Sequence, residues 1–118
     1  MSYDVRLKNP KTDETIILDK KHQIRGGTYA IGGTCEAWLN ITYNYTKILD
    51  RVLNGGIRGL YGKTAQEGIL ILEEAINKLG NDVDDNYWRA TEGNAKIALI
   101  GLLELAEKSP PEAIWDGD

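Results

Sequence analysis

The segment Gly62-Lys63-Thr64 has the residue types that end a phosphate-binding loop. In such a loop, backbone N–H groups cradle the phosphates and the lysine reaches the terminal ones. The full motif, GxxxxGK(S/T), requires its first glycine where this chain has Ile57, and Gly56 misses that position. It also requires a strand before the loop, whereas a helical pattern precedes this segment. We therefore expect no nucleotide hydrolysis, and a helix that starts with Thr64 as its N-cap.

A second segment partly matches the motif of a calcium-binding loop. Asp82, Asp84 and Asn86 stand at the first, third and fifth positions of a calcium-binding loop. The sixth position favours glycine, but Tyr87 occupies it, and Gly93 stands where the twelfth position needs a bidentate glutamate. Acidic residues also favour the positive end of a helix dipole. We interpret these side chains as helix caps and expect no metal site.

The sequence lacks the residues that a zinc site or a nucleophilic catalytic site would need. His22 is the only histidine and Cys35 the only cysteine, whereas a structural zinc site needs four such ligands. A Cys-His nucleophile would need folding to bring the two side chains together, and no local signature supports it. Cys35 is interpreted as a small core residue. We expect no catalytic residues, no cofactor and no enzymatic activity.

Three segments carry more polar and aromatic residues than packing requires: residues 22–29, 38–45 and 58–63. Tyrosine, tryptophan, arginine and asparagine are enriched at recognition sites. A competing interpretation is structural, because the chain has no Phe and its 6 Tyr and 3 Trp must supply the aromatic core. Tyr43 and Trp88 are assigned to packing for this reason. The candidate ligand- or partner-binding residues are Arg25, Tyr29, Asn40, Asn44, Tyr45, Arg58, Tyr61 and Lys63.

Strand patterns fill the N-terminal half of the chain. Apolar residues alternate with polar ones at residues 3–7 and 36–43, which is the period of a half-buried strand. Residues 15–18 are β-branched and apolar, and residues 9–13 form a turn, so residues 3–19 are predicted to form a β-hairpin. Another short strand is predicted at residues 28–31, between two pairs of glycines.

Helical spacing follows in the C-terminal half. Apolar residues recur at helical spacing in residues 48–53 and 64–79, and Thr64 with Glu67 forms a capping-box pattern. A third helical pattern runs to residue 106 and includes Trp88 on its apolar face. Gly93 within it predicts a close contact or a break near residues 91–94. Trp115, in the acidic tail, is expected to dock on the domain or to bind a partner.

Composition completes the fold prediction. The chain has 118 residues, with 14 Lys+Arg against 18 Asp+Glu and a net charge of -4. We predict one α+β domain over residues 1–118, with about four antiparallel strands in the N-terminal half covered on one face by two or three helices. The acidic balance argues against general nucleic-acid binding. The absence of a signal sequence and of a long apolar run predicts a cytoplasmic protein that does not bind membranes.

Several segments resemble small proteins of bacteriophages and bacterial prophages whose function is unassigned. They are residues 22–30 (HQIRGGTYA), 36–45 (EAWLNITYNY), 61–64 (YGKT), 91–96 (TEGNAK) and the ending WDGD. The resemblance covers nearly the whole chain. It implies a host-cell cytoplasmic setting, and it assigns no mechanism and no functional residue.

The expected function is that of a phage- or prophage-type accessory protein that binds a host or phage protein without catalysis. The alternative is a binder of a small anionic metabolite or nucleotide signal, through Arg25, Arg58 and Lys63. A virion structural component and an enzyme with an unfamiliar site are further alternatives. Self-association into a homo-oligomer is compatible with each of them, because an open sheet edge or bare helix face needs a cover.

Overall fold

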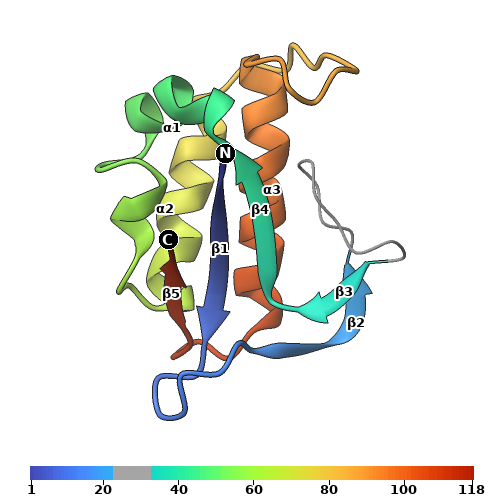
Figure 1. The fold of residues 1–118 in the computed structure, drawn as a ribbon. Coiled ribbons are helices and arrows are strands. Elements are labelled where there is room, and N and C mark those ends of the chain that lie inside the picture. The colour runs from blue at the N-terminus through green and yellow to red at the C-terminus, as the bar shows by residue number, and fades with distance from the viewer. Residues whose placement is uncertain (23–32) are drawn as a thin grey trace.

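The centre of the fold is strand β1 (Ser2–Lys8), which pairs antiparallel with β4 (Trp38–Thr42) and β5 (Ile114–Gly117) in the computed structural model. The structure describes residues 1–22 and 33–118. A second ribbon pairs β2 (Ile17–His22) with β3 (Thr34–Glu36) and extends to the side of the main sheet (Figure 1). The sheet thus combines N-terminal strands with one strand from the C-terminal tail, which the sequence pattern did not predict.

The predicted hairpin of residues 3–19 is wrong in its strand pairing. The chain does turn back after β1, where the Asn9 N–H donates to the Glu14 carbonyl at 2.8 Å. An isolated bridge between Lys8 and Thr15 and a hydrogen bond from the Ile16 N–H to the Leu7 carbonyl, at 2.9 Å, then link the two arms, but no strand ladder forms between them. β2 pairs with β3 instead, because β4 and β5 already occupy both edges of β1. The strand predicted at residues 28–31 lies outside the described residues.

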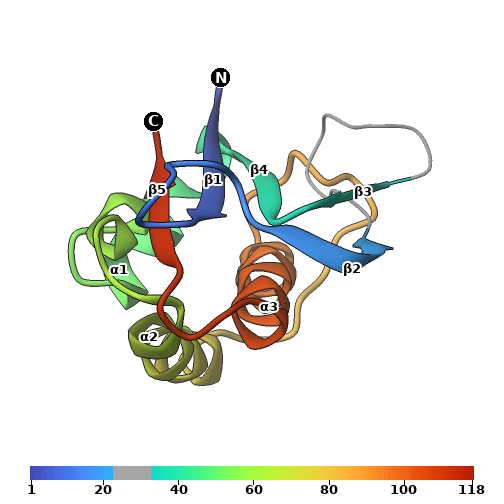
Figure 2. The ribbon, with the colours of Figure 1, turned by 90° about the horizontal axis from the view of Figure 1, so that it is seen from below.

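Two long helices, α2 (Ala65–Asn77) and α3 (Glu92–Lys108), lie on the same face of the main sheet (Figure 2). A short helix, α1 (Thr46–Val52), and the 3₁₀ turn η2 (Ile57–Leu60) lie beside α2, and a further 3₁₀ turn, η1 (Tyr43–Tyr45), precedes α1. This arrangement confirms the α+β fold with helices on one face. None of the helices in the described ranges is long and apolar enough to cross a membrane.

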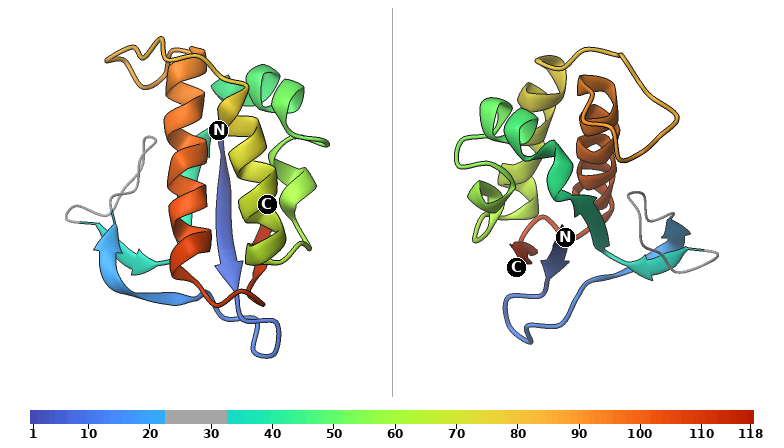
Figure 3. Two further views of the ribbon diagram at one scale, coloured as in Figure 1. Left: turned by 180° about the vertical axis from the view of Figure 1, so that it is seen from behind. Right: turned by 45° about the horizontal axis from the view of Figure 1, so that its top comes forward.

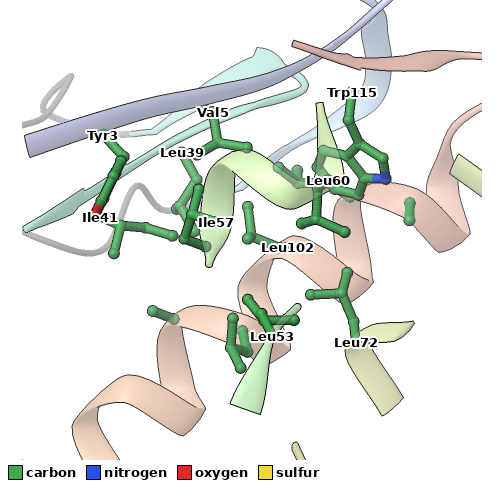
Figure 4. Packing of buried hydrophobic residues seen from close by; sticks show 14 of the residues in the cluster. Tyr3, Val5, Leu39, Ile41, Leu53, Ile57, Leu60, Leu72, Leu102 and Trp115 are labelled. Carbon is green, nitrogen blue, oxygen red and sulfur yellow. The ribbon is translucent and has the colours of Figure 1, made fainter. Parts of the chain in front are cut away.

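The core lies between the sheet and the two long helices. Val5, Leu39 and Ile41 point from β1 and β4 toward Leu72 of α2 and Leu102 of α3, and all are at most 2% exposed (Figure 4). The alternation seen in the sequence places these strand residues on one face. Each such side chain contributes roughly 1.5–3 kcal/mol on burial.

The predicted capping box at the start of α2 is confirmed. The Glu67 N–H donates to the Thr64 hydroxyl at 3.1 Å, and the Thr64 N–H donates to the Glu67 carboxylate at 2.9 Å. The backbone H-bond from Thr64 holds the pKa of the Glu67 carboxyl below its usual range. This segment therefore starts a helix, as expected, rather than forming a phosphate loop.

The C-terminal tail docks on the domain. Trp115 is 1% exposed, and its ring lies so close to Gly68 of α2 that a Cβ there would fall 2.2 Å from the indole nitrogen. The Gly62 N–H donates to the Trp115 carbonyl and the Trp115 N–H donates to the Lys63 carbonyl, both at 2.9 Å. Residues 62–66 thus cover the outer edge of β5, which would otherwise be free for pairing with another chain.

Helix α3 begins later than the sequence pattern indicated. Its first residue is Glu92 and its N-cap is Thr91, so the break predicted near residues 91–94 is its start. Trp88 was assigned to the core and is instead 51% exposed, in the connection between α2 and α3. The physical reason is Gly93, where a Cβ would meet the Val83 nitrogen at 2.6 Å. The incoming chain packs directly on the helix at this point and cannot continue it.

Candidate functional site

The predicted binding residues do not converge on one site. Arg25 and Tyr29 lie outside the described residues. Arg58 and Tyr61 contact the tail, whereas Lys63 lines a groove on another side of η2. The remaining predicted residues are on or just after β4: Asn40, Asn44 and Tyr45.

Arg58 and Tyr61 belong to a cluster of aromatic and charged side chains at the end of the sheet. The Arg58 guanidinium donates from Nε to the carbonyl oxygen of Asp118 at 2.9 Å and lies over the rings of Tyr3 and Tyr43, 5.1 and 5.9 Å from their centroids. The Tyr61 hydroxyl donates to the same carbonyl at 3.4 Å. These side chains are paired within the chain, so they hold β5 against β1 rather than forming an open recognition surface.

The pKa of the Tyr61 hydroxyl is shifted by its surroundings. Its pKa is raised above the ordinary tyrosine value, first by burial and then by the negative charge of Asp118. A raised pKa keeps this hydroxyl protonated and able to donate at neutral pH. That state suits its hydrogen bond to the tail.

Asn40 is also used internally. It is 5% exposed, and its amide donates to the Ser2 hydroxyl at 2.7 Å and to the Asp4 carboxylate at 2.8 Å. Asp4 lies directly opposite Asn40 in the β1–β4 register. A buried amide is expected to be hydrogen-bonded in this way, and Asn40 acts as a cross-strand link.

Lys63 lines a groove along α2 with a volume of about 400 Å³. Its apolar floor includes Leu53, Leu60 and Ile71, and Lys78 also lines it. This volume falls within the ~300–1,000 Å³ of small-molecule sites. However, Lys63 and Lys78 precede and follow α2, and a rise of 1.5 Å per residue places their backbones roughly 20 Å apart. Glu74 also lines the groove, and its carboxylate opposes the binding of a compact anion there.

Asn44 and Tyr45 hold the long connection between α2 and α3, which we name the α2–α3 loop (residues 78–91). The Asn44 amide donates to the Trp88 carbonyl at 2.8 Å, and the Tyr45 hydroxyl donates to the Tyr87 carbonyl. Tyr45 itself is fully buried, and burial raises its pKa above the ordinary value, with a further contribution from Tyr87. Tyr45 therefore supports the loop from beneath and is not itself exposed to a partner.

Asn94 is the residue that organises the loop, and it was not predicted. It is 5% exposed in the first turn of α3. Its side-chain oxygen accepts the Asp84 N–H at 3.0 Å, and its amide donates to the carbonyls of Asn86 and Arg89 at 3.2 and 3.0 Å. A polar side chain within a helical pattern gives no sign of burial in the sequence; the adjacent Gly93 was the only available signal.

The acids and amides of the calcium-like motif serve the same purpose. Asp82 accepts the Gly93 N–H at 3.1 Å, Asp84 accepts the Asn86 N–H at 2.7 Å, and Asn86 accepts the Trp88 N–H at 3.1 Å. In residues 1–22 and 33–118, no group of three or more His, Cys, Asp and Glu side chains could hold a metal ion. The motif fixes the loop backbone through capping and turn interactions.

The result is an irregular loop with a fixed backbone that projects beyond the N-terminal end of α3 (Figure 3). Irregular loops of this length are uncommon in compact domains and are usually functional or disordered. This loop is bonded to β4, η1 and α3, yet it leaves Trp88 51% and Val83 57% exposed. An ordered backbone that presents a tryptophan is suited to recognition, since little conformational entropy remains to be lost on binding.

A pocket of about 220 Å³ lies between the loop and the residues that support it, Tyr45, Asn94 and the start of α3, and we name it the loop pocket. Its lining consists of apolar and aromatic side chains, two carboxylates and one amide. The first group comprises Tyr45, Val83, Tyr87, Ile97 and Ala98, the carboxylates are Asp84 and Asp85, and the amide is Asn94.

Comparison with known proteins gives one similarity. The chain is 32% identical over 98 residues to a ribosomal protein L11 methyltransferase of Marinomonas sp. (strain MWYL1). The aligned region is 82% of this chain but 30% of the methyltransferase, so the chain spans less than a third of that protein. No model of a known protein family matches the sequence. No solved structure matches it.

Proposed function

We propose that this chain is a binding protein of phage or prophage type, and that it recognises a host or phage protein through the α2–α3 loop without catalysis. Trp88 is the anchor residue of this interaction. The observation that carries the proposal is the exposure of Trp88 on a loop whose backbone is tied down by Asn94, Asn44 and Tyr45.

The chemistry of the loop supports a protein partner. Trp is among the residues most enriched in binding hot spots, and such residues are effective when they are held in place before binding. The Trp88 ring packs edge-on against Tyr87, with 5.2 Å between centroids, which restricts its rotation while leaving about half of its surface open. Val83 is a second exposed apolar side chain on the same loop.

Two sequence relationships are consistent with this function. The resemblance to prophage proteins supplies the setting of a host-cell cytoplasm. The methyltransferase with partial similarity acts, by its name, on a ribosomal protein, and so it also has a protein as its partner; because it is an enzyme, it does not support the absence of catalysis. Neither relationship carries the proposal, which depends on the loop.

The proposal is tested by affinity capture from a bacterial host lysate, followed by mass spectrometry of the retained proteins and small molecules. The wild-type chain is compared with Trp88→Ala and with a matched control, Leu70→Ala. Leu70 is an apolar residue on α2 with 68% exposure, so its removal changes a similar kind of surface elsewhere.

We expect a protein that is retained by the wild-type chain and by Leu70→Ala and is lost with Trp88→Ala. Purified complex would then be measured by calorimetry, where loss of a hot-spot side chain lowers affinity about 30-fold or more. Equal retention by all three proteins would contradict a role for the loop. A retained anion that disappears with Lys63→Ala, with no retained protein, would support the small-ligand alternative instead.

A further inference from the structure

The loop pocket has a size and lining that define its occupant more closely. Its volume of about 220 Å³ is below the ~300–1,000 Å³ of sites for drug-sized ligands. A pocket of this size, lined by Tyr87, whose ring packs against the exposed Trp88, fits one long side chain of a bound protein. Its apolar walls suit the stem of that side chain, and its carboxylates determine the charge of the tip.

The carboxylates favour a cation. Asp84 and Asp85 both line the pocket. Within residues 1–22 and 33–118, the carboxylate of Asp85 has no ion pair, and Asp84 has a distant one, with 3.6 Å to Nε of Arg89. Charge-assisted hydrogen bonds are shorter, about 2.7–2.9 Å. Oδ1 of Asp84 already accepts the Asn86 N–H at 2.7 Å, but the long Arg89 contact leaves Oδ2 able to bind another donor.

Two cations near the loop are already engaged. Arg51 pairs with Glu92 at 2.9 Å, and the Lys96 ammonium donates to the Asn81 side chain at 2.8 Å. These two cations therefore do not neutralise Asp85. The overall charge of the chain, -4, acts in the same direction.

The two carboxylates and the aromatic lining of the pocket distinguish between the two cationic side chains. A guanidinium is planar and weakly hydrated, stacks on aromatic faces and can bind a carboxylate through two parallel hydrogen bonds. An ammonium is compact and strongly hydrated. We propose that the loop pocket binds an arginine side chain of the partner protein, with its stem along Val83 and Ile97 and its guanidinium at Asp85. This inference rests on the proposed function of the loop.

The test uses a probe of known chemistry, N-acetyl-L-arginine methylamide, titrated into the ¹⁵N-labelled full chain at low salt. Amide shifts are recorded for the wild-type chain, for Asp85→Asn and for a control that removes the same charge elsewhere, Glu73→Gln. Glu73 is exposed on α2 and does not line the loop pocket. N-acetyl-L-citrulline methylamide, which has the same shape without the charge, and N-acetyl-L-lysine methylamide serve as comparison ligands.

We expect saturable shifts of residues 83–87 and 94–98 with the arginine amide, weaker shifts with the lysine amide and none with the citrulline amide. Asp85→Asn should weaken binding about fivefold, the effect of a partly exposed ion pair, and Glu73→Gln should leave it unchanged. Absence of shifts in these residues, equal shifts with the citrulline amide, or insensitivity to Asp85→Asn would overturn the inference.

The proposed function and the assignment of the pocket can be overturned independently of each other. A partner that is lost with Trp88→Ala, together with a pocket that ignores the arginine amide, would retain the proposed function and overturn the pocket assignment. Arginine binding in the pocket, together with unchanged partner capture by Trp88→Ala, would overturn the proposed function and leave the pocket as a cation site.

Discussion

The C-terminal tail and the α2–α3 loop each contain one tryptophan, and its side chain is buried in the tail but exposed in the loop. In the tail, Trp115 is 1% exposed, and backbone hydrogen bonds to residues 62–66 draw it into the domain. In the loop, Trp88 is 51% exposed, although the backbone around it is equally well bonded. The difference is that Gly68 opens space for the Trp115 ring in α2, whereas none of the glycines in residues 55–117 has the Trp88 ring among its nearest neighbours. Backbone order alone therefore does not determine whether a side chain stabilises the fold or remains available for binding.

The largest expected effect is the loss of the buried tryptophan. Trp115→Ala should lower the free energy of unfolding by about 4 kcal/mol, because truncation of a buried aromatic side chain removes its contacts and leaves a cavity. Trp88→Ala should change it by less than about 1 kcal/mol, as expected for a half-exposed side chain. Urea denaturation followed by circular dichroism measures both. Similar losses in the two variants would show that Trp88 belongs to the core after all.

These two residues also show what the sequence could and could not predict. The alternation of β1, the capping box of Thr64 and Glu67 and the break near Gly93 depend on neighbours in the chain, and all three are present in the structure. The pairing of β1 with β5 depends on residues more than a hundred positions away, which local patterns do not encode. Trp88 fits the helical spacing of α3, but contact between Gly93 and Val83 removes it from the helix.

The candidate site was predicted in part. Among the proposed binding residues, Asn44 and Tyr45 contact the loop, whereas Arg58 and Tyr61 hold the tail. Composition suggested all four equally, because residue type does not reveal whether a polar atom is paired within the chain. Asn94 had no distinguishing pattern, since one buried amide does not alter the hydrophobic periodicity of a helix.

The second-largest expected loss of stability affects the loop and leaves the tail unchanged. Asn94→Ala removes three side-chain hydrogen bonds and leaves partly buried backbone groups of the loop without these partners. Each unsatisfied group costs about 1–3 kcal/mol, but the loop can relax toward solvent, so we expect a total loss of about 3 kcal/mol. Hydrogen exchange should accelerate at the Asp84 amide, whose acceptor is Asn94, while the Trp115 amide keeps its protection.

Asn77→Ala provides the control for this change, because Asn77 is exposed at the end of α2. Its stability should stay within about 0.5 kcal/mol of the wild-type value. If Asn94→Ala behaved like Asn77→Ala, the loop would not depend on the buried amide, and the proposed pre-organisation of Trp88 would lose its basis.

A smaller effect is expected where the loop touches α3. Gly93→Ala raises helix propensity by about 1 kcal/mol, but the added Cβ would meet the Val83 nitrogen at 2.6 Å and the Asp82 carbonyl carbon at 2.7 Å. Both are backbone atoms, so the loop must move, and we expect a net destabilisation of about 2 kcal/mol. Gly80→Ala is the matched control, because its nearest atom is at 3.5 Å. Thermal unfolding measures both variants. A melting temperature of Gly93→Ala equal to or above that of Gly80→Ala would contradict this contact.

The smallest effect at neutral pH concerns the tyrosine that each region buries. Tyr45→Phe removes the hydrogen bond to the loop, and Tyr61→Phe removes the one to the tail, each at a cost of about 1 kcal/mol. Both hydroxyls have a pKa above that of an unfolded tyrosine, mainly because of burial. Their contribution is therefore fully present below about pH 10 and is lost as the pH rises above it, because the unfolded chain ionises first.

Each phenylalanine variant should consequently be less stable than the wild type at pH 7 and should lose stability less steeply above about pH 10. Urea midpoints between pH 7 and pH 11 measure this slope. The regions can then be distinguished by hydrogen exchange at alkaline pH: Tyr45→Phe should alter protection only in residues near the loop, and Tyr61→Phe only near β5. An identical slope in the wild type and both variants would mean that neither hydroxyl is buried in solution, and the loop would then lack the support from beneath that keeps Trp88 in position.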